Sequence, residues 1–321
     1  MLTSAKLKEV ALKCGADVVG VASIDRFKNA PRELHPASMW PDVKSVVVFA
    51  VRIPRGAMRG IEEGTHWPSY HFFGYGGLGG FIAEVNQDLQ NFIEDNGWEA
   101  VPINAQATLK EYRPTRPSVA PDRLPATVVP SFRLAAAAAG LGELGYSKVF
   151  LTPKLGARQR FGIIYTDAPL DPDPLFEGSI CDRCMRCVAE CPAGAINGTR
   201  TVCADIEGRI FEWNDLDLGK CKLTHTGFNR AVSPFVVKDI PGLRLDISKQ
   251  TMSWQEAWDF ARTLTPLMRY STLIDLTYGQ HRPICGARGC IRACQDHLEE
   301  EGLIEVRLRT PFQRRPIWRL E

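Results

Sequence analysis

The chain has 321 residues, enough for one large domain or two smaller ones, with 45% hydrophobic and 24% charged residues. The formal net charge of +2 gives no support for nucleic-acid binding, and no apolar run is long enough to span a bilayer. The first residues mix charges with apolar positions instead of forming a signal peptide, so we expect a cytoplasmic protein with no membrane or nucleic-acid partner.

Apolar periodicity predicts alternating helices and strands up to about residue 170. Period-3.6 patterns that stop at glycine indicate helices, and β-branched runs bounded by proline or glycine indicate strands. The predicted elements in chain order are a helix over 7–14, strands from 18 and 43, a helix over 79–97, a strand from 98, an alanine-rich helix from 132 and a strand from 160.

The segment DAPLDPDPLFEG, which begins at Asp167, interrupts this pattern with prolines and acids. We therefore expect one domain over 1–170 and a second, cysteine-rich domain over 171–321. A helical insert at about 228–280, with the segment MSWQEAWDFARTL, could cap a pocket or form a dimer surface.

The chain has ten cysteines, and four of them follow the spacing C-x2-C-x2-C-x3-C-P at Cys181, Cys184, Cys187 and Cys191. Three thiolates two residues apart fit three corners of a [4Fe-4S] cube, and the fourth serves a second cluster in two-cluster proteins. The alternative is a structural zinc site, which usually needs two separated C-x2-C pairs. The spacing therefore favours iron–sulfur clusters.

A second run, CGARGCIRAC, supplies three more cysteines, with a longer first spacing and Gln295 where a proline is usual. The symmetry of two-cluster ferredoxins assigns the last of them to the first cluster. The predicted ligands are Cys181, Cys184, Cys187 and Cys294 for the first cluster, and Cys191, Cys285, Cys290 and either Cys203 or Cys221 for the second. We expect Cys14 and the unused cysteine to be packed apolar thiols.

Two segments, AAAAAGLGELGYSKVFLTPKLGARQRFGIIYTDAPL over 135–170 and WNDLDLGKCKLTH, resemble the cobalamin-dependent iron–sulfur reductases. This family includes epoxyqueuosine reductases and reductive dehalogenases. With the cysteines, the resemblance covers about half of the chain. The second segment resembles the family's isolated cysteine, which favours Cys221 over Cys203. The resemblance implies an α+β fold, in which a nitroreductase-like α/β sandwich precedes a ferredoxin-like domain with two [4Fe-4S] clusters.

The resemblance also implies a base-off cobalamin that cycles through cobalt(I), and an external electron donor such as ferredoxin or flavodoxin. We expect Gly140, Gly142 and Gly145 in GLGELG to let the backbone approach the corrin, and Thr152 and Arg160 to reach its polar groups. The alternatives for GLGELG are a plain glycine turn at a helix end and a dinucleotide site.

The chain departs from both families in its proton donor. Epoxyqueuosine reductases have an aspartate before the alanine-rich helix, where this chain has Ser131 and Arg133, which argues against a tRNA substrate. Reductive dehalogenases use a tyrosine with a basic partner, and they usually have a twin-arginine export signal, which we do not find here. The aromatic segment GTHWPSYHFFGYGG offers Tyr70 and Tyr75 as acids, and a packed aromatic loop is the alternative.

Three functions fit these observations. The first is a cobalamin- and cluster-dependent reductase acting on a small organic substrate. The second is an electron-transfer or reductive-activation protein that serves another corrinoid protein and has no substrate of its own. The third is a cobalamin-handling protein. The long N-terminal half favours a bound cofactor, because an electron carrier would not need it.

Overall fold

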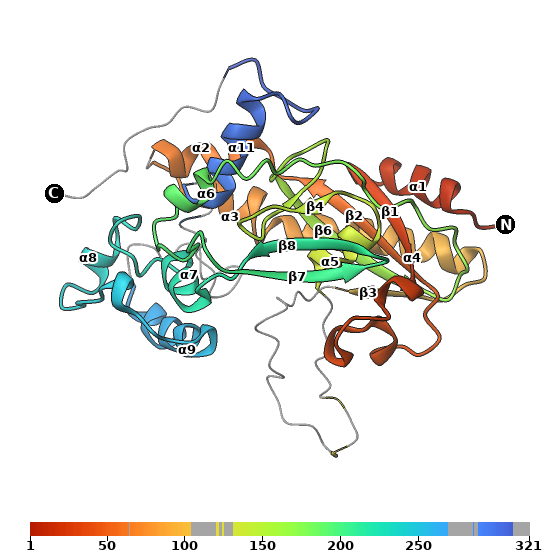
Figure 1. The fold of residues 1–321 in the computed structure, drawn as a ribbon, viewed down its shortest axis with the longest axis horizontal. Helices are drawn as coiled ribbons and strands as arrows, with labels where there is room; N and C mark the ends of the chain where they lie inside the picture. Colours follow the sequence, from red (N-terminus) through yellow and green to blue (C-terminus); the bar gives the residue numbers. More distant parts are fainter. Residues whose placement is uncertain are drawn as a thin grey trace.

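The structure is a computed structural model that describes residues 1–63, 65–103, 120–121, 124, 131–268, 285 and 288–310. At its centre is a four-stranded antiparallel sheet with the order β1-β2-β6-β3 (Figure 1). In the register of the sheet, Val48 pairs with Gly20 on one side and with Ile163 on the other. The strands are β1 (Val18–Ser23), β2 (Ser45–Arg52), β3 (Ala100–Ile103) and β6 (Gln159–Thr166).

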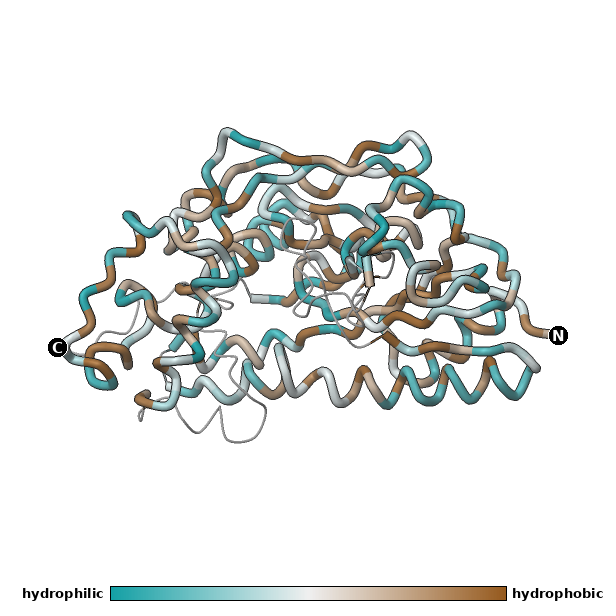
Figure 2. The backbone as a smooth tube through the Cα atoms, turned by 90° about the horizontal axis from the view of Figure 1, so that it is seen from below, coloured by the Kyte–Doolittle hydropathy of each residue, from teal (hydrophilic) through white to brown (hydrophobic). Residues whose placement is uncertain are grey.

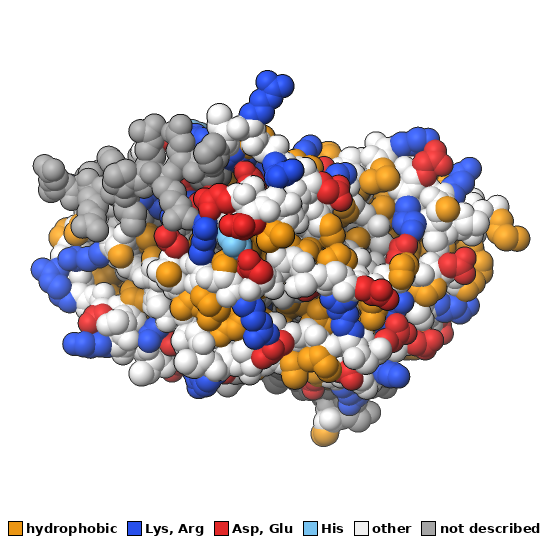
Figure 3. All heavy atoms as spheres, turned by 45° about the horizontal axis from the view of Figure 1, so that its top comes forward, with side chains coloured by type: hydrophobic (Ala, Val, Ile, Leu, Met, Phe, Trp, Pro, Cys, Tyr) orange, Lys and Arg blue, Asp and Glu red, His pale blue; other side chains and the backbone are white. Residues whose placement is uncertain are grey.

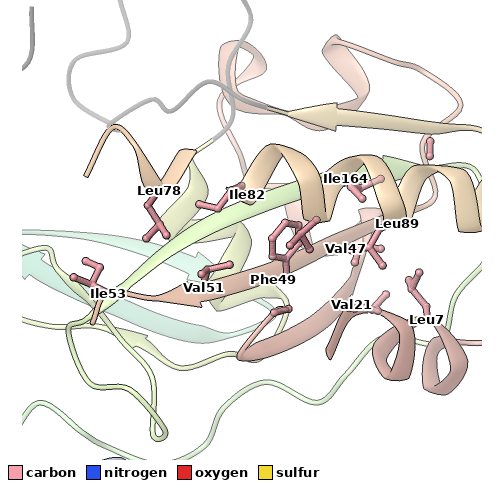
Figure 4. Close-up of a cluster of buried hydrophobic side chains, with 14 of the residues drawn as sticks. Leu7, Val21, Val47, Phe49, Val51, Ile53, Leu78, Ile82, Leu89 and Ile164 are labelled. Carbon is pink, nitrogen blue, oxygen red and sulfur yellow. The ribbon is translucent and has the colours of Figure 1, made fainter. Parts of the chain in front are cut away.

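Helices cover one face of this sheet. Side chains that alternate along a strand point to opposite faces, and Val47, Phe49 and Val51 of β2 point to this one (Figure 4). They pack against apolar side chains of α1 and α4, including Leu7, Ile82 and Leu89. In Figure 2 the long helix along the lower edge alternates polar and apolar residues, as expected of a helix that covers a core with one side. The helices on this face are α1 (Ser4–Lys13), α2 (Arg55–Glu63), α3 (Pro68–Gly74) and α4 (Leu78–Asp95).

The opposite face is covered by α5 (Phe132–Ala138) and by a hairpin of β7 (Thr201–Ile206) and β8 (Arg209–Asn214). The alanines 135–139 are all buried, and a Cβ at Gly20 would lie 2.2 Å from the carbonyl oxygen of Ala139. Small residues therefore let α5 lie directly on the sheet. Phe211 and Trp213 of β8 belong to the same core, so this layer combines residues from either side of position 170.

The other elements are a short hairpin, several helices that lie mostly in the cysteine-rich part of the chain, and short turns. A short hairpin of β4 (Glu143–Leu144) and β5 (Phe150–Leu151) connects α5 to β6. The remaining helices are α6 (Arg186–Ala189), α7 (Leu218–His225), α8 (Val236–Asp239), α9 (Trp254–Leu264) and α11 (Cys290–Glu300). Short 3-10 turns lie at Ile24–Phe27, Arg32–Leu34, Pro36–Ser38, Ile247–Lys249 and Thr265–Leu267.

The predicted helices and strands are confirmed within a few residues, and the protein has the expected mixed α/β character. The aromatic segment, for which a packed loop was one alternative, is partly helical, because Pro68–Gly74 forms α3 and α4 begins at Leu78. Proline at the first helical position suits this start, since its missing N–H would have no helical partner.

The described surface mixes both charges, as the near-neutral net charge suggests. Figure 3 shows acidic and basic side chains interspersed over one face of the molecule. Among the described residues, no helix combines the length and the apolar content needed to cross a membrane.

Candidate functional site

The structure brings four of the predicted cluster cysteines around one hollow. This small hollow, of about 20 Å³, is lined by Cys181, Cys184, Cys187 and Cys294. Cys181 and Cys184 come from the loop that leads into α6, where Arg183 and Met185 have positive φ values of 56° and 60°. Cys187 lies in α6 itself, and Cys294 lies in α11. The left-handed residues turn the loop tightly enough for its cysteines to face the same space.

The electrostatics of this first cysteine group favour metal cations between the thiolates. Burial, followed by the nearby Cys181 and Cys184, raises the pKa of the Cys187 thiol to about 11. Burial also raises the pKa of Cys294 well above its usual value, and Cys181 and Cys187 add to the effect. Four crowded thiolates repel one another unless cations lie between them, so the donor set fits an iron–sulfur cluster.

A second cysteine group contains Cys191, Cys221, Cys285 and Cys290. Burial raises the pKa of Cys285, and the charges that add to this effect are those of Cys221, Cys290 and Cys191. Burial likewise raises the pKa of Cys290, with Cys221, Cys191 and Cys187 as the neighbours. Since Cys187 belongs to the first group, the two groups are adjacent. The eight cysteines thus fall into the two sets predicted from the sequence, and their roles as ligands remain a prediction.

The two other cysteines lie outside these groups. Cys14 packs against the helical core at the end of α1, as expected of an apolar thiol. Cys203 is exposed on β7 opposite Glu212, so the expectation of a packed thiol is wrong for it. The reason is strand alternation: Val202, Ala204 and Ile206 pack against the core, which turns Cys203 outward.

Glu143 supports the first cysteine group in a way that the sequence did not reveal. Its Oε1 accepts hydrogen bonds from the backbone N–H groups of Ile180 at 2.5 Å and Cys181 at 2.7 Å. The backbone N–H of Tyr146 donates to the Cys181 sulfur at 3.3 Å. The hairpin of GLGELG therefore holds the cysteine loop in place. An acid between the glycines was the available sequence clue.

The residue that replaces the usual proline after Cys294 also has a structural role. Gln295 is fully buried, and its Oε1 accepts a hydrogen bond from the backbone N–H of Ala157 at 2.9 Å. A Cβ at Gly156 would lie 2.6 Å from the same oxygen. The turn within TPKLGAR therefore packs directly against α11.

The two candidate tyrosines lie together beside the second cysteine group. Arg160 Nη2 donates a hydrogen bond to the Tyr70 hydroxyl at 3.3 Å, and its guanidinium lies 5.1 Å from the centre of the Tyr75 ring. The Tyr75 hydroxyl oxygen is 3.1 Å from His225 Nε2. Burial raises the pKa of both tyrosines, and Arg160 opposes the shift in each. Both hydroxyls therefore keep their protons at neutral pH.

A second hollow, of about 70 Å³, adjoins this cluster of side chains. Its polar lining is Arg133, Gln159 and Arg160, and phenylalanines of α5, β5 and β6 supply most of the apolar wall. Ile291, the residue after Cys290, completes the lining, so the hollow lies next to the second cysteine group. The apolar wall and the two guanidinium groups can contact the polar edge of a larger molecule that lies outside this small hollow.

The other residues predicted to bind a cofactor make their close contacts within the chain. A Cβ added to Gly140 would lie 2.1 Å from the carbonyl oxygen of Pro174. A Cβ added to Gly142 would lie 2.0 Å from the carbonyl oxygen of Leu151. A Cβ at Gly145 would meet the Leu151 side chain at 3.0 Å. Thr152 is fully buried, and its hydroxyl accepts from the backbone N–H of Leu155. Of the five residues, Arg160 is the one that lines the hollow beside the cysteines.

These features define a cysteine-rich protein with a buried tyrosine–arginine pair, and comparisons with known proteins show its relatives. No family model matches the chain. Over 161 residues, 48% of this chain, it is 40% identical to the tetrachloroethene reductive dehalogenase of Dehalobacter restrictus. Over 60 residues, 19% of this chain, it is 37% identical to the epoxyqueuosine reductase of Pseudomonas aeruginosa. The matched parts span 24% and 17% of those two proteins.

Solved structures of the same two kinds of protein resemble this one at low sequence identity. The epoxyqueuosine reductase of Bacillus subtilis has a TM-score of 0.46 at 16% identity, covering 93% of this chain and 82% of that chain. A catabolic reductive dehalogenase in complex with 3-bromo-4-hydroxybenzoic acid has a TM-score of 0.48 at 17% identity, covering 98% of this chain and 41% of that chain. The sequence matches make the chain a relative of the reductive dehalogenases and epoxyqueuosine reductases, with no close match to either.

Proposed function

We propose that this protein is an iron–sulfur and cobalamin-dependent reductase that acts on a small organic substrate. Each of its two cysteine groups binds one [4Fe-4S] cluster, in a ferredoxin-like part that adjoins a nitroreductase-like part. The observation that supports this most directly is that the eight cysteines fall into two adjacent groups, the second of which adjoins Tyr70, Tyr75 and Arg160.

The exposure of the cysteines supports an order for electron flow. Cys184 of the first group is exposed, whereas the four cysteines of the second group are only partly exposed. An external donor such as ferredoxin or flavodoxin, in the cytoplasm, would therefore deliver electrons to the first cluster. The second cluster would lie next to the first cluster and next to the hollow lined by Arg160.

The hollow lined by Arg133 and Arg160 is where we place one edge of the corrinoid. When bound, a corrinoid supplies the low-potential reducing centre, and the protein supplies orientation and protons. The two guanidinium groups would bind polar groups at the edge of the ring, and the phenylalanines would exclude water. A protonated, buried Tyr70 held by Arg160 would give a proton to the reduced substrate.

A second function has its own support. The three glycines of GLGELG pack against the chain itself, which removes one reason to expect a corrin at that turn. An electron-transfer or reductive-activation protein for another corrinoid protein needs the clusters but no hollow of its own. We also propose that the substrate is not a tRNA, since Ser131 caps the start of α5 and Arg133 lies in its first turn, where an acid would be needed.

The test is to measure iron, sulfide and cobalamin binding on anaerobically reconstituted protein. Two clusters predict about eight iron and about eight acid-labile sulfide per chain. Added cobalamin should form a tight complex with a base-off absorption spectrum, and Arg160→Gln should weaken it without loss of iron. About four iron per chain would contradict the two-cluster assignment. Eight iron without binding of micromolar cobalamin would favour the electron-transfer function.

A further inference from the structure

One imidazole ring lies between the second cysteine group and a candidate tyrosine. His225 Nδ1 is 3.9 Å from the Cys285 sulfur, and Nε2 is 3.1 Å from the Tyr75 hydroxyl oxygen. The rings of His225 and Tyr75 are 5.2 Å apart between centroids. His225 ends α7 four residues after Cys221, and residues at this spacing share one side of a helix. Helix α7 thus presents a cysteine and a histidine to the same place.

We propose that His225 connects the second cluster to the tyrosine pair, with Nδ1–H donating to the Cys285 sulfur and Nε2 accepting the Tyr75 hydroxyl proton. This inference rests on the proposed function, because it requires the second cluster. It makes His225 a positioning residue that also sets the potential of that cluster.

The tautomer follows from the partners. A neutral imidazole has one N–H donor and one acceptor nitrogen. An iron-bound thiolate sulfur has no proton and can only accept, so the nitrogen that faces it must be the donor. That nitrogen is Nδ1, which leaves Nε2 to accept from the Tyr75 O–H.

This arrangement separates the roles of the two tyrosines. The Tyr75 proton is directed to His225, so it is not directed to a substrate. The Tyr70 oxygen accepts from Arg160, and this bond does not use the Tyr70 proton. Tyr70 is therefore the proton donor, and Tyr75 is the hydrogen-bond partner of His225 Nε2.

A hydrogen bond to a ligand sulfur also affects the cluster itself. A reduced cluster has one more negative charge, so an N–H that points at the sulfur stabilises the reduced form more than the oxidised form. Loss of this donor should shift the midpoint potential of the second cluster to a more negative value. The first cluster, which His225 does not contact among the described residues, should keep its potential.

The test uses two amides that each replace one nitrogen of the ring. An asparagine amide nitrogen reaches the position of Nδ1, and a glutamine amide nitrogen reaches that of Nε2. The potentials of both clusters are measured by EPR-monitored reductive titration of the reconstituted full chain, with iron content as the occupancy check. His66→Gln, at an exposed histidine, is the matched control.

In His225→Gln, the ratio of reduced to oxidised second cluster at a fixed potential should fall about fivefold, the ratio that one lost hydrogen bond of about 1 kcal/mol gives. His225→Asn and Tyr75→Phe should keep this ratio within twofold, because the donor to sulfur remains. Equal shifts in the Asn and Gln variants, no shift in either, or loss of the second cluster from both would overturn the inference. If the wild-type protein has no second cluster, the proposed function fails first and the inference with it.

Discussion

At the scale of single residues, one cysteine distinguishes the two possible ligand sets of the proposed second cluster. Cys221 and Cys203 were both open from spacing alone, and the structure places Cys221 beside Cys285 and Cys290. We expect Cys221→Ser to lose or convert one cluster, because serine is a poor ligand for iron in these clusters. Cys203→Ser, the matched control on exposed β7, should keep the full iron content. The opposite pattern, measured as iron and sulfide per chain, would refute the assignment.

The buried tyrosines should make the protein sensitive to high pH. Burial raises the pKa of Tyr70 and Tyr75 above the ordinary value of about 10. Their contribution to stability is therefore fully present below about pH 10 and is lost as the pH rises through their folded-state values, since the unfolded chain ionises first. Tyr70→Phe should flatten the alkaline fall in the free energy of unfolding. If the free energy of unfolding falls equally at alkaline pH in the wild-type protein and in Tyr70→Phe, this prediction is contradicted.

Residues whose role depends on local spacing could be predicted from the sequence, and residues whose role depends on distant contacts could not. The cysteine sets belong to the first kind, because ligand spacing within a loop determines how thiolates meet. Glu143, Gln295 and His225 belong to the second kind. Each acts on a partner far along the chain, such as Gln295 on Ala157, and no periodic pattern marks them.

At the scale of elements, strong periodicity predicted most helices and strands, but it could not predict which of them pair or pack together. Strand β2 is buried on both faces and α4 has one apolar face, so their patterns were clear. The β7–β8 hairpin was not predicted, although β7 alternates exposed and inward-facing residues, because the cysteine spacing dominated the interpretation of this part of the chain. Helix α11 was missed because the cysteine pattern directed attention to a loop, although the helix begins at Cys290 itself.

Helix α11 is fixed to α2 by a buried ion pair. Arg292 Nη1 lies 3.0 Å from Glu62 Oε1, and Glu62 is 1% exposed. Burial raises the pKa of Glu62, and Arg292 opposes this shift. Arg288 adds hydrogen bonds to the carbonyl oxygens of Ile61 and Glu62 at the end of α2. These contacts determine where Cys290 and Cys294 lie.

We expect Glu62→Ala to lower the free energy of unfolding by about 3 kcal/mol, since it leaves a buried arginine without this partner. The same change should reduce the retention of both clusters, because Cys290 and Cys294 belong to different groups on one helix. Glu63→Ala is the control: its ion pair with Arg59 lies near the surface and should contribute about 0.5 kcal/mol or less. Chemical denaturation and iron analysis measure both effects. Equal losses in the two variants would rule out this role for the buried pair.

At the scale of the whole molecule, the predicted boundary at residue 170 separates two chemical roles without separating two cores. Ile206, Phe211 and Trp213 of the β7–β8 hairpin are at most 5% exposed, and they pack in the core with α5 and the sheet. Gln295 is bound to the backbone at Ala157, and Glu143 holds the loop at Cys181. The cysteine-rich half therefore depends on the first half for both packing and cluster geometry.

We accordingly expect a fragment of residues 171–321 not to fold on its own. Exposing three large apolar side chains costs about 1.5–3 kcal/mol each, which is comparable with the total stability of about 5–15 kcal/mol of a typical domain. The fragment should show no cooperative thermal transition and should retain less than half of the iron of the full chain after reconstitution. Co-expression with residues 1–170 should restore iron binding, because the shared core and the Glu143 and Ala157 contacts can form again between the two pieces. A fragment that melts cooperatively with both clusters bound would show instead that the boundary separates two independent domains.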